Sequence, residues 1–254
     1  RAYSVLASAE LQRQQYEPAL AAASKGLEQY PRSGESPSLA FAIGLSQYFL
    51  NAYPAAAASF ERYVERFPAD ARLVEGMYYA GQCWQILGKY QVAAERFLRV
   101  VHTFPRSAYV PEALFLAAEN LYNGYQFEQA LQTYNRILEE FPTGEYADDA
   151  AYSSAWTLFE LKRMDEGVAR MELLVQRYPE STHAPKAQFT VGDYYYNIRE
   201  YQKGKDAYAA LVTRFPGSAE APRARALIVE LDEQIANQIY EEAVALYQAQ
   251  DFRG

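Results

Sequence analysis

The sequence of 254 residues contains few side chains that could carry out nucleophilic, acid–base or metal chemistry. His102 and His183 are its two histidines and lie 81 residues apart, and Cys83 is its single cysteine. A zinc site needs several His or Cys ligands, so neither histidine is expected to bind a metal. Cys83 stands beside Trp84, which favours a small residue filling the core over a nucleophile.

Enzyme motifs are absent as well. The sequence has no phosphate-binding G-x-x-x-x-G-K-[ST], no G-x-S-x-G and no H-E-x-x-H. Asp148 and Asp149 are expected in the first turn of a helix, where negative charge interacts favourably with the helix macrodipole. We therefore predict no catalytic residue, no metal, no cofactor and a protein that is not an enzyme.

Aromatic side chains, in contrast, recur at fixed spacings. The first aromatic column comprises Phe41, Tyr78, Phe115, Tyr152 and Phe189. Seven residues later, on the same face of a helix, the second aromatic column comprises Tyr48, Gln85, Tyr122, Phe159 and Tyr196. The middle column between them comprises Leu45, Gln82, Glu119, Trp156 and Asp193.

Tyr and Trp contribute strongly to protein interfaces because they bury a large area at low entropic cost. These columns are therefore candidates for a binding surface. Packing against neighbouring helices is the other interpretation, and the sequence leaves both open.

The elements that position these columns follow from a repeat. An aromatic residue precedes proline at six places, each 37 residues after the last: Tyr30-Pro31, Phe67-Pro68, Phe104-Pro105, Phe141-Pro142, Tyr178-Pro179 and Phe215-Pro216. A fixed period of this length is typical of a solenoid of stacked supersecondary units.

Each unit is expected to contain two helices. The first helix carries a small residue at a fixed place, namely Gly44, Gly81, Ala118, Ala155 or Gly192, which allows close helix approach. The second carries a small residue and, four positions later, a bulky one, as in Ala56 and Phe60. The turn between the helices is placed at Tyr16, Tyr53, Tyr90, Phe127, Met164 and Tyr201, with Gly88 and Gly124 as left-handed helix ends.

Proline and serine mark the ends of these helices. The aromatic-proline pair is expected to stop the second helix, because proline disfavours helical geometry in the preceding residue. The predicted N-caps of the next helix are Ser33, Ser107, Ser181 and Ser218. The prolines expected in its first turn are Pro37, Pro111, Pro185 and Pro222.

This arrangement resembles the tetratricopeptide repeat in the small position of the first helix, the small-then-aromatic pair of the second and the closing proline. It departs from that pattern in lacking a tryptophan early in the first helix and in its period of 37 instead of about 34 residues. The longer Phe-Pro-x-Ser form is similar to repeats of bacterial cell-envelope proteins, including outer-membrane assembly lipoproteins and TolA-binding division coordinators.

The resemblance implies an all-α fold, a right-handed α-solenoid that forms a single domain over residues 1–254. Its expected units are residues 1–33, 34–70, 71–107, 108–144, 145–181, 182–218 and 219–254. The last unit is expected to be an incomplete repeat with an extended first helix.

The resemblance also implies that the first helices line a concave groove that binds a protein or peptide. The expected groove residues are Phe41, Leu45, Tyr48, Tyr78, Gln82, Phe115, Glu119, Tyr122, Tyr152, Trp156, Phe159, Phe189, Asp193 and Tyr196. Relatives that bind a C-terminal carboxylate have Lys, Asn and Arg at such positions, so that function is not expected. Aromatic residues mixed with Glu112, Glu119, Asp149 and Asp193 suit a segment with apolar anchors and some basic residues.

The composition restricts the function further. A net charge of −8 without a cluster of Lys and Arg argues against a nucleic-acid partner. No apolar run approaches the roughly 18 residues of a membrane span. The chain starts at Arg1, which suggests a processed start or a cut piece of a longer chain. The resemblance to cell-envelope proteins makes envelope assembly in a bacterium the favoured context, periplasmic or at the outer membrane, with the cytoplasm still open.

The repeat changes after Phe215-Pro216. The next turn, Gln250-Asp251-Phe252, comes 14 residues late, which predicts a longer helix with an apolar stripe at Leu231, Ile235, Ile239, Val244 and Tyr247. Further repeats or a docked partner are expected to cover this helix at residues 219–249. Two other functions stay open, a glycan-facing module of an exopolysaccharide export system and a regulatory domain of a larger protein.

Overall fold

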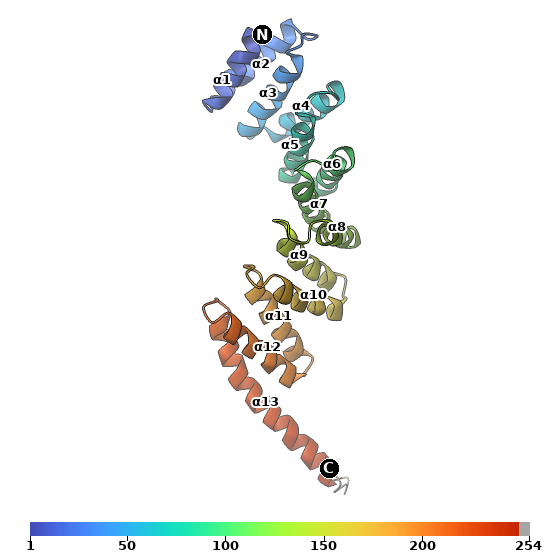
Figure 1. The fold of residues 1–254 in the computed structure, drawn as a ribbon, viewed down its shortest axis with the longest axis vertical. Coiled ribbons are helices and arrows are strands. Elements are labelled where there is room, and N and C mark those ends of the chain that lie inside the picture. The colour runs from blue at the N-terminus through green and yellow to red at the C-terminus, as the bar shows by residue number, and fades with distance from the viewer. Residues whose placement is uncertain (249–254) are drawn as a thin grey trace. The chain divides into compact units, whose positions relative to one another are not determined.

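The computed structural model describes residues 1–248 as thirteen α-helices, and these residues contain no strand (Figure 1). The helices are α1 (Ala2–Gln12), α2 (Tyr16–Gln29), α3 (Ser36–Phe49), α4 (Tyr53–Arg66), α5 (Leu73–Ile86), α6 (Tyr90–Thr103), α7 (Val110–Asn123), α8 (Phe127–Glu140), α9 (Ala147–Glu160), α10 (Met164–Arg177), α11 (Ala184–Asn197), α12 (Tyr201–Arg214) and α13 (Ala221–Gln248). Odd-numbered helices are the first helices of the repeats, and even-numbered ones are the second.

The helices pack mainly on their neighbours in sequence and form two compact units. Unit 1 comprises residues 1–146 with α1 to α8, and unit 2 begins at Ala147 with α9. Consecutive helix packing of this kind makes each unit an α-solenoid, as the sequence predicts. The repeat boundaries and a single superhelix over the whole chain stay predictions.

Small residues in the first helices allow rings of the second helices to approach closely. A Cβ atom added to Gly44 would lie 2.8 Å from Cε1 of Phe60, and one added to Gly81 would lie 2.8 Å from Cε1 of Phe97. Gly192 lies closer still to the ring of Tyr208. The prediction of close packing at this position is confirmed.

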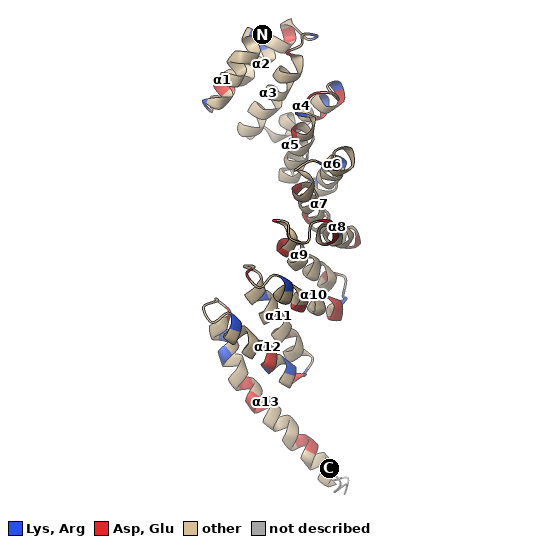
Figure 2. Cartoon of the chain, in the orientation of Figure 1, with Lys and Arg blue, Asp and Glu red and all other residues tan. Residues whose placement is uncertain are grey.

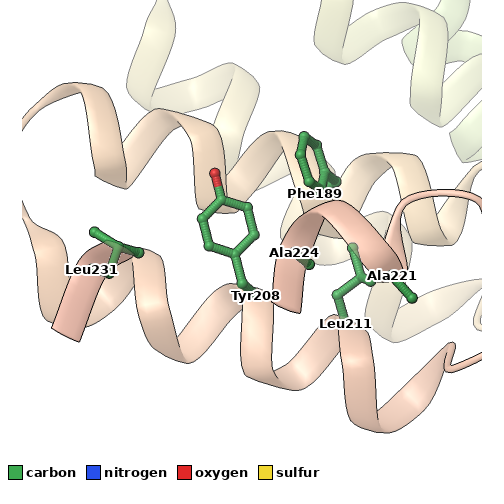
Figure 3. Close-up of a cluster of buried hydrophobic side chains, with 6 residues drawn as sticks. All are labelled: Phe189, Tyr208, Leu211, Ala221, Ala224 and Leu231. Carbon is green, nitrogen blue, oxygen red and sulfur yellow. The ribbon is translucent and has the colours of Figure 1, made fainter. Parts of the chain in front are cut away.

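The core of unit 2 shows how a repeat is joined to the following helix (Figure 3). Tyr208 and Leu211 of α12 are fully buried together with Leu231 of α13, and Phe189 of α11 contributes its ring to the same cluster. In unit 1, a corresponding cluster around Ala7, Ala23 and Leu39 joins α1, α2 and α3. Each repeat therefore needs the next helix to complete its core.

The ends of the second helices and the prolines behave as predicted. Phe67, for example, follows the last residue of α4 with φ −127°, and its N–H still bonds to the Tyr63 carbonyl. Pro37, Pro111 and Pro185 lie in the first turns of α3, α7 and α11. Proline is tolerated there because its missing N–H has no partner within the helix.

The prediction that serines cap the first helices is wrong. The N-cap residues of α7 and α11 are Tyr109 and His183, and neither makes a side-chain cap. Two consecutive turns separate each aromatic-proline pair from the next helix, which therefore begins three residues after the serine. Ser107 Oγ accepts the Tyr109 N–H at 3.2 Å and Ser181 Oγ accepts the His183 N–H at 3.1 Å, so these serines stabilise the connecting turn.

The turn between the helices of a repeat also differs in detail from the prediction. Gly88 has the expected left-handed φ of 68°, but Gly124 has φ −85° and Tyr125 takes the left-handed position with φ 60°. Six left-handed residues recur with the 37-residue period: Gln14, Asn51, Gly88, Tyr125, Lys162 and Arg199. The residues predicted in the turn are instead the first residues of the second helices, because the left-handed residue of each turn lies two positions earlier. They are Tyr16, Tyr53, Tyr90, Phe127, Met164 and Tyr201.

The prediction of a longer last helix is confirmed. α13 has 28 residues, whereas α12 has 14. It packs on α12 and continues beyond it (Figure 1). The predicted turn at Gln250-Asp251-Phe252 lies outside the described residues.

Candidate functional site

The first aromatic column lies where one repeat meets the next. The residue 31 positions after each of four rings packs over that ring. The four pairs are Phe41 with Arg72, Tyr78 with Tyr109, Phe115 with Tyr146 and Tyr152 with His183.

The contacts of these pairs are close. The Arg72 guanidinium carbon lies 4.6 Å from the Phe41 ring centroid, and the His183 ring stacks on Tyr152 at 4.3 Å. Only 5% of Phe41 and 8% of Phe189 is exposed. The first column therefore packs between repeats, and a ligand would reach mainly its partly exposed members.

Polar groups hold Tyr78 at the surface of unit 1. Its hydroxyl donates to Glu112 Oε1 at 2.5 Å, and Gln82 Nε2 donates to the Tyr78 oxygen at 2.9 Å. Burial and the bond to Glu112 raise the pKa of Tyr78. The predicted site residues Tyr78 and Gln82 thus belong to one network with Glu112, which links α5 to α7.

Two acids of the middle column have a structural partner. Glu119 accepts the Tyr134 hydroxyl, and Asp193 accepts the Tyr208 hydroxyl at 2.5 Å. A buried phenol needs an acceptor, and both tyrosines are fully buried. The two repeats with Phe60 and Phe97 at the equivalent position need no such acceptor, and they have Leu45 and Gln82 in the middle column. A further role for these acids in binding a basic partner stays a prediction.

One accessible aromatic surface of unit 2 lies on α9 and is completed by His183, the N-cap residue of α11. We call Tyr152, Trp156, Phe159 and His183 the α9 patch. Trp156 is 39% exposed, and its ring lies 6.2 Å from Tyr152 and 5.4 Å from Phe159. His183 Nε2 lies 2.7 Å from Asp149 Oδ1, which orients the imidazole over Tyr152. Asp148 and Asp149 occupy the first turn of α9, as predicted.

The second aromatic column closes the turns between paired helices. Tyr48, Tyr122 and Tyr196 each meet the first aromatic residue of the following helix, at centroid distances of 5.7, 5.3 and 6.1 Å. Phe159 packs directly over Gly167 of α10. These side chains and Gln85 are half-buried, so each keeps some surface exposed.

The residues that cover the first column were not predicted from the sequence. Arg72, Tyr109, Tyr146 and His183 follow one another at the same 37-residue period, and that signal could have revealed them. Each of them contacts a ring of the preceding repeat, and such a contact is not evident from the spacing of residues within one helix.

Two depressions lie at equivalent positions between second helices of adjacent repeats, one in each unit. One includes Leu27, Ile43 and Arg66, and the other includes Val175, Val191 and Arg214. Arg66 donates to the Pro31 carbonyl and Arg214 donates to the Val175 carbonyl at 3.1 Å. Arg66 of α4 thus contacts the turn that follows α2, and Arg214 of α12 contacts α10, so each arginine links adjacent repeats beside a depression.

Reactive groups do not gather in the part of the chain that the structure describes. Cys83 is fully buried, as predicted, and burial raises the pKa of its thiol to about 12. Among residues 1–248, no three His, Cys, Asp or Glu side chains cluster as a metal site would require. None of the described helices is long and apolar enough to cross a membrane.

Comparison with known families agrees with this geometry. A model described as a tetratricopeptide repeat matches residues 4–71 and 41–108, and a second such model matches residues 186–218. A model described as an outer membrane lipoprotein matches residues 86–194. The comparison with curated proteins gave no match.

Solved structures show the same fold. MamA from Desulfovibrio magneticus RS-1 has a TM-score of 0.55 at 14% identity, with 71% of this chain and 96% of that chain covered. MamA AMB-1 has a TM-score of 0.52 at 15% identity, covering 69% and 96%. YrrB, described as a TPR protein with an unusual peptide-binding site, has a TM-score of 0.54 at 16% identity, covering 80% and 97%.

The helix pairs, their period and the packing between repeats define an α-solenoid of helical repeats. The chain is a tetratricopeptide repeat protein, and it shares its fold with the solved structures of MamA and YrrB.

Proposed function

We propose that this protein is a non-enzymatic scaffold that binds a segment of a partner protein on the face of its first helices. The exposed Trp156 ring in the α9 patch carries the proposal. Its neighbours Tyr152 and Phe159 hold it in place, so little entropy is lost on binding, and tryptophan is enriched among residues that dominate interface energies. The peptide-binding site described for YrrB, a protein of the same fold, supports this function.

The chemistry of the face suggests the kind of segment that binds. Acidic residues lie on α7 and α9 (Figure 2). Among them, Glu112 accepts a hydrogen bond from Tyr78, and Asp149 lies against His183 of the α9 patch. A segment with apolar anchors and some Lys or Arg would complement each of these surfaces. The predicted groove residues are the candidates for contact, with Tyr122 in unit 1 and Trp156 in unit 2 accessible enough to be tested.

The cellular role that we propose is bacterial envelope assembly, in the periplasm or at the outer membrane. Support for it comes from the match of residues 86–194 to the outer membrane lipoprotein model. The test therefore starts from envelope material.

The first prediction concerns Trp156→Ala. We expect at least one protein from a bacterial envelope extract to be captured by the wild-type chain and lost with this variant, as mass spectrometry would show. With the purified partner, affinity should fall roughly 30-fold, the effect of losing about 2 kcal/mol at a hot spot. The melting temperature should change little because Trp156 is exposed.

Leu173→Ala is the matched control. Leu173 is 49% exposed on α10, a second helix, so its loss removes apolar surface away from the proposed binding face. Identical sets of captured proteins for wild type and Trp156→Ala would contradict the proposal. Tyr78→Ala and Tyr122→Ala, combined with Trp156→Ala, extend the test to unit 1.

A further inference from the structure

α13 has a second apolar face that α12 does not cover. Ala224 and Leu231 are fully buried against the core of unit 2. Other apolar side chains of α13 are exposed to solvent. Their exposed fractions are 63% for Val229, 61% for Ile239, 71% for Tyr240, 44% for Leu246 and 72% for Tyr247.

The open residues follow a coiled-coil spacing. Steps of three and four residues connect Val229, Asp232, Ala236, Ile239, Ala243 and Leu246, which we call the α13 seam. This is a period of about 3.5 residues, so the seam forms one continuous stripe along the helix. At 3.6 residues per turn it is rotated by roughly a quarter of a turn from the residues that face α12.

Comparison with the preceding repeat shows that, within residues 1–248, the α13 seam lacks a covering helix. Val229 comes 37 residues after Gly192, the small position that the Tyr208 ring covers within its own repeat. The same surface on α13 is open, and no helix among the described residues packs on it. The larger Val229 side chain would prevent an aromatic ring from approaching as closely as Tyr208 approaches Gly192. A second helix with an aromatic ring at this position would therefore pack less closely on α13 than α12 packs on α11.

Charge determines which partner fits. Residues 226–248 contain five acids, Glu230, Asp232, Glu233, Glu241 and Glu242, and no Lys, Arg or His (Figure 2). Glu233 and Glu242 flank the seam on its two sides, the positions that pair with charged residues of a partner helix in coiled coils. Asp232 within the seam already pairs with Lys205 of α12.

A second copy of this chain would bring acids against acids, because residues 226–248 of the opposing helix contain no base. An anionic membrane surface would be repelled for the same reason. Both are poor occupants of the seam, and a basic helix is complementary to it.

We propose that the α13 seam binds an amphipathic α-helix of another protein. That helix presents large apolar residues opposite Ala236 and Ala243, where the small side chains leave room, and Lys or Arg beside Glu233 and Glu242. Tyr240 and Tyr247 cover one edge of its apolar face. This interaction is separate from the one proposed for the α9 patch, so the two can be tested independently.

The test uses two synthetic helical peptides of three heptads with the same leucine and isoleucine seam. One peptide has Lys at the flanking positions and the other has Glu, and binding to the full chain is followed by fluorescence anisotropy. We expect the Lys peptide to bind at least tenfold more tightly than the Glu peptide, with an advantage that shrinks as salt screens the charges. Trp156→Ala should bind the Lys peptide like the wild type.

The variant I239D/L246D should weaken binding of the Lys peptide at least tenfold, because it places charge in the apolar seam. V5D/L6D is the matched control, since Val5 and Leu6 are both exposed on α1 and the pair gains the same two negative charges. The double variant E233K/E242K should reverse the preference, so that the Glu peptide binds more tightly. Circular dichroism and melting temperature should be unchanged in all of them because the substituted side chains are solvent-exposed.

Four results would overturn the proposal. They are equal binding of the Lys and Glu peptides, binding of neither, wild-type affinity in I239D/L246D, and a dimer in sedimentation that I239D dissociates. The last result would make a second copy of the chain the occupant.

Discussion

At the scale of single residues, buried tyrosines explain two acids, Glu119 and Asp193, that the sequence predicted in a binding surface. Tyr134 and Tyr208 are fully buried at positions where other repeats have phenylalanine, and each hydroxyl donates to an acid of the first helix. Tyr63 donates in the same way to Asp70 at 2.5 Å. The hydroxyl group that distinguishes tyrosine from phenylalanine thus requires a hydrogen-bond acceptor on a neighbouring segment.

Tyr208→Phe tests this pairing through pH. Burial and the hydrogen bond to Asp193 raise the pKa of Tyr208 above the unfolded value of about 10. A raised pKa means that the neutral phenol is favoured in the folded state. The contribution of Tyr208 to the free energy of unfolding is therefore fully present below about pH 10 and is lost as the pH rises further. Thermal unfolding should therefore show a falling melting temperature above pH 10.

We expect Tyr208→Phe to make that alkaline fall shallower and to lower the free energy of unfolding at pH 7 by about 1 kcal/mol, since Asp193 loses a donor. Tyr240→Phe is the control, because Tyr240 is 71% exposed and its hydroxyl lies outside the core. The same alkaline slope in wild type and Tyr208→Phe would show that other groups determine it.

At the scale of elements, a left-handed residue ends every first helix from α1 to α11. Glycine occupies this position only at Gly88, whereas Tyr125, Lys162 and Arg199 are among the residues that take it elsewhere. A left-handed backbone costs about 1–2 kcal/mol for a residue with a Cβ atom. The packing of the paired helices must therefore impose the turn, which explains why a search for glycine misplaced it at Gly124.

Opposite substitutions at equivalent turns should have opposite effects. Gly88→Ala should lower the free energy of unfolding by about 1 kcal/mol, because alanine is strained at φ 68°. Lys162→Gly removes that strain at φ 63° and should raise stability by up to about 1 kcal/mol. Urea denaturation measures both. Gly34→Ala is the control, since its added Cβ meets nothing within 4 Å and its φ is outside the left-handed region. Destabilisation by Lys162→Gly would refute this view of the turn.

At the scale of the whole molecule, stability is built from contacts between helices adjacent in sequence. Each core cluster depends on the following helix, as α13 completes the core around Tyr208 and Phe189. In such an array the free energy is close to a sum of repeat and interface terms. A local substitution should therefore have a local effect.

Gly192→Ala tests that expectation. The added methyl group would clash with the Tyr208 ring, and overpacking of this kind costs about 1–3 kcal/mol. Hydrogen exchange should become faster in α11, α12 and α13, while α1 to α4 in unit 1 exchange as in the wild type. Gly217→Ala, with nothing within 4 Å of the added atom, should change neither region. Faster exchange throughout the chain would mean that the repeats unfold as one cooperative unit.

The period, the helices, the small-residue contacts and the proline-terminated helix ends could all be predicted from the sequence. These features depend on interactions within one repeat, such as Gly44 with Phe60, and the constant spacing of 37 residues makes them visible along the chain. The longer α13 could also be predicted, because the next turn signal comes late.

The contacts between one repeat and the next could not be predicted from the sequence and are evident only in the folded chain. In the folded chain, His183 stacks on Tyr152, and Glu119 and Asp193 accept hydrogen bonds from buried tyrosines. Trp156 and the apolar residues of the α13 seam remain exposed. These outcomes depend on the angle between successive helix pairs and on which helix covers which face. Neither is encoded in a periodic pattern along one chain, because the same pattern is compatible with a column that packs and a column that binds.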